Sequence, residues 1–182
     1  MNVIIAGSRT IGSPRILAMV IDEVRWPITC VFSGMADENN PGRRSVDMLG
    51  VDWANRHGIP YTPFRADWDD ISRPGAIVRY RADGKPYDAA EGHRRNRRMA
   101  EAGADALIFL WDGTSPGTRS MFDIMLSVNK LVYGRITHKG YEYRVADRKT
   151  AREFPESPFP VPPPRFHAAL EVTYMARNGD RQ

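Results

Sequence analysis

The chain has 182 residues, the usual size of a single domain, and 42% hydrophobic and 26% charged residues, an ordinary globular composition. One cysteine, Cys30, excludes an intrachain disulfide, and no run of 18 apolar residues could span a membrane. Lysine and arginine number 26 against 22 acidic residues, a net charge of +4 that fits a solvated basic surface, an anionic ligand or nucleic acid. We therefore expect a cytoplasmic protein without a membrane partner.

The first part of the chain alternates short apolar runs with amphipathic segments. Apolar runs between turns are typical of buried strands, and apolar residues spaced by three or four are typical of helices. Ser13 before Pro14 indicates a helix start, and Gly58 indicates a helix end. We predict, in chain order, a strand over 3–6, a helix over 14–24, a strand over 28–32, a helix over 44–57 and a strand over 60–64.

Between residues 67 and 91 this alternation stops. Two strand-like runs, 76–80 and 85–87, flank Asp83-Gly84, a sequence typical of a β-hairpin turn. The pattern then resumes with a helix over 89–102, a strand over 104–111, a helix over 118–128, a strand over 131–136 and a further run, 141–145, placed to pair with it. From residue 151 the chain is rich in proline, which predicts an extended tail on the surface or between subunits.

Alternating strands and helices are typical of a parallel sheet covered by helices on both faces. We predict a Rossmann-like three-layer α/β sandwich with a mostly parallel five-stranded sheet, a β-hairpin insertion and an extended proline-rich C-terminal tail. The domain is expected over residues 1–150 and the extension over 151–182. In such sheets ligands bind beyond the carboxyl ends of the strands.

Three turns at those ends combine glycine with hydroxyl or charged side chains. Glycine lets a ligand approach the backbone, and the amides and dipole at a helix N-terminus attract anions. Each turn alone also fits an ordinary strand–helix connection, and neither a Walker A loop nor a GxGxxG motif occurs. The predicted phosphate contacts are Gly7, Ser8, Arg9, Ser33, Gly34, Ser115, Gly117 and Thr118.

Further side chains are placed to reach the same edge. Asp47 could hold ribose hydroxyls or be a solvated helix residue, and Trp68 could stack on a base or pack in the core. Within the basic run 93–98, helical geometry turns Arg95 and Asn96 toward the site and leaves the other basic residues in solvent. Asp112, directly after the strand over 104–111, completes the predicted ligand-binding set.

In order along the chain, these segments resemble the YspA-type, YpsA-related branch of the SLOG superfamily. The resemblance spans about residues 1–136, and it rests on residues 3–9, 33–34, 45–54, 65–68, 92–99 and 111–118. That superfamily includes the LOG phosphoribohydrolases and the DNA-processing protein DprA. The resemblance implies a Rossmann-like domain that binds nucleotides or nucleotide sugars, and it settles no reaction.

Two departures from the family pattern bear on activity. Residues 38–43 are inserted after Ser33-Gly34 and remodel the loop after the second strand. LOG enzymes carry a glutamate three residues after the threonine of their Gly-Thr turn, where this chain has Met121. A methionine cannot activate water or stabilise a developing positive charge. The remaining candidates for a catalytic carboxylate are Asp47, Asp67 and Asp112.

These observations favour a module that binds an ADP-ribose-like or other nucleotide phosphate ligand and acts as a sensor, a sequestering protein or a partner module. An N-glycosidic nucleotide hydrolase related to the LOG enzymes is an alternative. DprA-like nucleic-acid binding is a less favoured one. We expect no cofactor and no metal, since the four histidines and one cysteine show no ligand spacing, and we expect a homo-oligomer.

Overall fold

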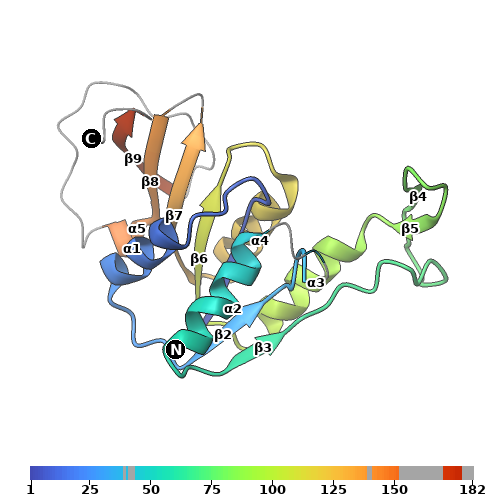
Figure 1. Ribbon diagram of the computed structural model, residues 1–182, viewed down its shortest axis with the longest axis horizontal. Coiled ribbons are helices and arrows are strands. Elements are labelled where there is room, and N and C mark those ends of the chain that lie inside the picture. Colours follow the sequence, from blue (N-terminus) through green and yellow to red (C-terminus); the bar gives the residue numbers. More distant parts are fainter. Residues whose placement is uncertain (39, 41–43, 139–140, 152–169, 178–182) are drawn as a thin grey trace.

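The computed structural model describes residues 1–38, 40, 44–138, 141–151 and 170–177. They form a three-layer α/β fold around one sheet, which confirms the predicted fold class (Figure 1). The strands are β1 (Asn2–Gly7), β2 (Cys30–Ser33), β3 (Tyr61–Pro63), β4 (Val78–Tyr80), β5 (Pro86–Asp88), β6 (Ala106–Trp111), β7 (Leu131–His138), β8 (Tyr141–Asp147) and β9 (Leu170–Arg177). The helices are α1 (Pro14–Val24), α2 (Val46–Arg56), α3 (Glu91–Glu101), α4 (Pro116–Ser127) and the short α5 (Arg148–Ala151).

The main sheet has the strand order β3-β2-β1-β6-β7-β8-β9. The first five strands in this order are parallel, and they are the five that the sequence predicts. β8 pairs antiparallel with β7, and β9 pairs antiparallel with β8. β9 lies in the segment expected to be an extended tail, so part of that segment extends the sheet. Residues 152–169 of the expected tail lie outside the described residues.

The core consists of two apolar layers on the two faces of the sheet. Every residue of β6 is buried, which explains its continuous apolar sequence. One layer packs α1 and α2 against the sheet through residues such as Leu17 and Trp53. The other packs α3 and α4 through residues such as Met99 and Phe122. No helix within the described ranges is long and apolar enough to cross a membrane.

The predicted hairpin is present as a separate sheet of β4 and β5, with Gly84 at φ +80° in its turn. It stands away from the main sheet, ahead of α3 (Figure 1). Two buried carboxylates hold its base against α3. Asp88 accepts from the amides of Ile77 and Ala90, and Glu91, in the first turn of α3, accepts from the amide of Asp67 at 3.4 Å and lies 3.5 Å from Arg73.

Gly7, the last residue of β1, is packed against the backbone of β6 and the first residue of α2. A Cβ atom at Gly7 would lie 2.2 Å from the carbonyl oxygen of Leu110 and 2.7 Å from a methyl carbon of Val46. The residue must therefore be glycine because of packing within the protein. Gly117, in the first turn of α4, has no neighbouring atom within 4 Å of the same position.

We expect Gly7→Ala to lower the free energy of unfolding by about 1–3 kcal/mol, because the clash involves backbone and cannot be relieved by a rotamer change. Gly117→Ala is the matched control, and its stability should be unchanged or slightly raised, since alanine favours a helix. Chemical denaturation of both variants measures the difference. Equal stabilities of the two variants would contradict the assignment of Gly7 to packing.

Candidate functional site

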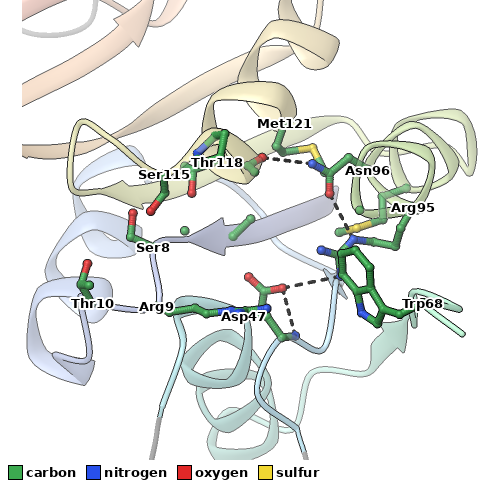
Figure 2. A pocket seen from close by; sticks show the side chains of 17 residues that line it. Ser8, Arg9, Thr10, Asp47, Trp68, Arg95, Asn96, Ser115, Thr118 and Met121 are labelled. Atoms are coloured by element: carbon green, nitrogen blue, oxygen red, sulfur yellow. Dashed lines mark hydrogen bonds and ion pairs between the residues drawn. The ribbon is translucent and has the colours of Figure 1, made fainter. Parts of the chain in front are cut away.

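A cavity of about 410 Å³ lies beyond the carboxyl end of β1, between the first turn of α4 and the loop after β2. Its walls come from five segments that are far apart in sequence, and Figure 2 shows their side chains converging. Ten of the thirteen predicted ligand-binding residues line it: Gly7, Ser8, Arg9, Asp47, Trp68, Arg95, Asn96, Ser115, Gly117 and Thr118. The predicted edge of the sheet is therefore where these residues meet.

The N-terminus of α4 forms one wall of this cavity. Ser115 is the N-cap residue, but its side chain makes no capping hydrogen bond to the helix, and Pro116 has no amide hydrogen. The next two residues, Gly117 and Thr118, line the cavity, and first-turn amides have no partner within their own helix. This helix end thus presents donors and the positive end of the helix dipole to the cavity.

Asp112 organises the turn that leads into α4 instead of facing the cavity. Its carboxylate accepts from the amide of Ser115 at 2.7 Å, the amide of Thr114 at 2.9 Å, and the hydroxyls of Ser115 and Thr10 at 2.8 and 2.9 Å. Partial burial opposes ionisation, but the hydrogen bonds from Ser115, Thr114 and Thr10 outweigh it and hold the pKa of Asp112 well below its usual range. Asp112 is therefore a structural anion.

The turn after β1 contributes less open backbone than the sequence suggests. The amide of Ser8 donates to the carbonyl of Leu110 at 2.9 Å, and its hydroxyl accepts from the amide of Asp112 at 3.0 Å. The amide of Ser8 is therefore already used by a partner within the protein, and the expectation that it is open to a ligand is wrong. Arg9 remains at the rim, its side chain 55% exposed and 3.6 Å from Asp37.

Asp47 and Arg95 fill the space beside the turn after β2. Asp47 is 4% exposed, accepts from the amide of Ala36 at 3.3 Å and lies 4.0 Å from the guanidinium of Arg95 (Figure 2). Burial raises the pKa of Asp47, and the charge of Arg95 and the amide hydrogen bonds counteract this only in part. Arg95 also donates to the carbonyl of Gly34.

Ser33 and Gly34 consequently do not reach the main cavity. Ser33 is fully buried, and its hydroxyl donates to the carbonyl of Asp47 at 3.1 Å. A Cβ atom at Gly34 would lie 2.1 Å from the guanidinium of Arg95, so the glycine makes room for this side chain. The predicted open glycine turn after β2 is instead occupied by an arginine of the protein itself.

Asn96 and Trp68 form the wall opposite Arg9. The amide nitrogen of Asn96 donates to the carbonyl of Gly117 at 3.1 Å, and its oxygen accepts from Arg95 at 3.1 Å. Asn96 therefore ties α3 to the first turn of α4. Trp68 packs its indole against Gly92, where a Cβ atom would lie 2.8 Å from the ring, and it lines the cavity beside Arg95.

The rest of the basic run on α3 differs from the expectation of solvated side chains. Arg94 and Arg98 contact the buried carboxylate of Glu91, at 3.0 and 2.7 Å. Arg97 is exposed, as expected. The burial of Glu91 could not be predicted from the sequence, because an acidic residue at the start of a helix usually faces solvent.

The three catalytic candidates separate in the structure. Asp47 is the single carboxylate among the described residues that line the cavity. Asp67 pairs with Arg73 at 3.0 Å outside it, and Asp112 is held in its turn. Met121 lies in the cavity wall and is 1% exposed. No group of three or more histidine, cysteine, aspartate or glutamate residues within the described part of the chain could hold a metal ion.

We expect Asp112→Asn to lower stability at pH 7 by about 1 kcal/mol, because solvent screening limits what the charge contributes. A carboxylate with a depressed pKa stabilises the fold above its unfolded pKa of about 3.9 and loses that contribution as the pH falls further. The difference from wild type should therefore be constant at pH 5–8 and shrink below about pH 4. Urea titrations across this range test it, with Asp52→Asn, in an exposed ion pair with Arg44, as control. A difference independent of pH would contradict the assigned role.

Comparison with known proteins identifies a family for the N-terminal part of the chain. No curated protein matches the sequence. Residues 1–70, which contain β1 to β3 and reach Trp68, match the YspA, cpYpsA-related SLOG family. The resemblance beyond residue 70 rests on the motifs alone. The first 70 residues of the chain therefore carry a YspA/cpYpsA-related SLOG family domain.

Proposed function

We propose that this protein binds a nucleotide or nucleotide sugar in the cavity and acts as a sensor, a sequestering protein or a partner module. The observation that carries the proposal is the first turn of α4, which faces the cavity without a side-chain cap. A phosphate placed there would accept from the amides of Gly117 and Thr118 and gain from the helix dipole. Arg9, at the rim, would add a charge-assisted hydrogen bond.

The size and lining of the cavity support a ligand larger than a free phosphate. Its volume of about 410 Å³ falls in the range typical of small-molecule sites. Trp68 offers an aromatic surface for a base, and Met99 and Met121 form an apolar part of the wall. The cavity thus combines an anion site with an apolar compartment, as a nucleotide requires.

The hydrolase alternative has less support from the same residues. Asp47, the carboxylate in the wall, already accepts from the amide of Ala36 and lies beside Arg95, so its position is fixed by the protein. Met121 supplies neither a proton nor a charge. Nucleic-acid binding also loses support, because Arg94, Arg95 and Arg98 are engaged with buried carboxylates.

A thermal-shift assay with AMP and ADP-ribose tests the proposal. A ligand at 100 times its Kd should add about 2.7 kcal/mol to the free energy of unfolding. Arg9→Ala should weaken binding about tenfold, because it removes the guanidinium that bonds the phosphate, and Thr118→Val should weaken it less, because it removes the hydroxyl beside the phosphate and keeps the amide. Arg97→Ala, which removes an exposed arginine elsewhere on α3, is the control and should bind as wild type does. Wild-type binding in both site variants would place the ligand elsewhere.

Incubation with nucleoside monophosphates and ADP-ribose distinguishes a binding module from a hydrolase. We expect no free base by chromatography, because the cavity offers no carboxylate free to activate water or stabilise the sugar cation. Release of base that disappears in Asp47→Asn would contradict this and assign catalysis to Asp47. Affinity for a DNA oligonucleotide that falls steeply with salt would instead favour nucleic-acid binding.

A further inference from the structure

A second hollow, of about 370 Å³, opens beside the main cavity. Four residues, Arg9, Ala36, Trp68 and Arg95, line both, so the two spaces adjoin each other. Its remaining wall consists of the turn after β2 and the segment after β3, including Glu38 and Arg65. In Figure 2 the labelled residues shared by the two spaces, Arg9, Trp68 and Arg95, lie on the side of the cavity away from Ser115 and Thr118. A ligand anchored at α4 can therefore continue past Trp68 into the second hollow.

Two arginines at this hollow are held by carboxylates from one short segment. Arg65 donates from Nε to Glu38 at 2.7 Å and from a second nitrogen to the other oxygen of the same carboxylate. Arg9 lies 3.6 Å from Asp37. The hydrogen bond from Arg65 lowers the pKa of Glu38, which therefore stays ionised at neutral pH. A forked arginine–carboxylate pair has the geometry with which arginine also binds phosphate.

The arginine side of both ion pairs is open to solvent. The side chain of Arg65 is 60% exposed and that of Arg9 is 55% exposed, against 28% for Glu38 and 11% for Asp37. An ion pair that is open to water on one side contributes little to stability, so an incoming anion can compete for the two guanidinium groups. The backbone of the segment that carries Asp37 and Glu38 is also strained. Met35 and Asp37 have φ of +55° and +62°, the left-handed region that non-glycine residues avoid.

We propose that the second hollow binds a second anionic group of the ligand at Arg65 and Arg9, and that Glu38 and Asp37 occupy these guanidinium groups until that ligand arrives. The inference rests on the proposed nucleotide site. It narrows the ligand to a nucleotide with a second phosphate beyond the one at α4, with its base or sugar beside Trp68. It also gives the carboxylates of Asp37 and Glu38, at the start of the inserted segment, a role as internal competitors for the two arginines.

Calorimetric titration of the full chain with AMP, adenosine 3′,5′-bisphosphate and ADP-ribose tests this inference. Wild type should bind one of the two-phosphate ligands about tenfold more tightly than AMP, as one added charge-assisted contact predicts. Arg65→Gln should remove this advantage and leave AMP binding unchanged. Glu38→Gln should increase the advantage, since it removes the competitor and keeps the size of the side chain.

The decisive result is that Arg65→Gln and Glu38→Gln change the affinity advantage of the two-phosphate ligand over AMP in opposite directions. If the Arg65–Glu38 pair merely supported the loop, both variants would weaken binding together, and that outcome would overturn the inference. Equal affinity of all three ligands would overturn it as well, while leaving the proposed nucleotide site intact. Failure of all three ligands to bind would overturn both proposals. Arg81→Gln and Asp69→Asn, in an exposed ion pair on the hairpin arm, are the matched controls and should change nothing.

Discussion

The carboxylate of Asp47 is the constraint on which the site depends. It is buried at the start of α2, accepts from the amide of Ala36 after β2 and lies 4.0 Å from the guanidinium of Arg95 on α3. One side chain thus joins the loop after β2 to helices on opposite faces of the sheet. A buried charge is tolerated when it is paired and hydrogen-bonded in this way, and breaking such a set is costly.

The same network decides which groups remain for a ligand. Arg95 bonds to Gly34 and Asn96, and Asn96 in turn bonds to Gly117, so these polar groups position the wall of the cavity. What remains is the first turn of α4, the exposed Arg9 and the indole of Trp68. The polar groups that position the wall are therefore already hydrogen-bonded within the protein. The donors that face the cavity lie in the first turn of α4 and along the rim. Such preorganisation lowers the entropy cost of binding.

Local sequence signals were sufficient for most of the fold and for bringing ten of the predicted residues around one cavity. Ser13-Pro14 begins α1, Asp83-Gly84 makes the hairpin turn, and the apolar run of β6 forms a central strand. Because parallel strands place their carboxyl ends at one edge, the turns that follow them could be brought together from the sequence. β9 was missed because the prolines before it indicated an extended tail, although the alternation of Leu170-Glu-Val-Thr-Tyr follows them.

The sequence could not show which donors are already in use. Whether the amide of Ser8 meets a ligand or the carbonyl of Leu110 depends on distances across the fold. The amino-acid sequence is the same in either case. The glycines illustrate this. Gly7 and Gly34 fit a phosphate turn equally well in sequence, but their missing side chains make room for Leu110 and Arg95. Of these three turn glycines, Gly117 is the one with no atom within 4 Å of a Cβ position.

The pairing of β9 with β8 affects how the protein can be shortened. Their ladder runs from Tyr141–Arg177 to Asp147–Leu170, so a chain cut at the expected domain boundary near residue 150 would lose the partner of β8. A strand stripped of its neighbour offers a row of unsatisfied amide and carbonyl groups to other molecules and promotes aggregation. Fragments for crystallisation or binding studies should therefore extend beyond Arg177, even where only the cavity beyond β1 is of interest.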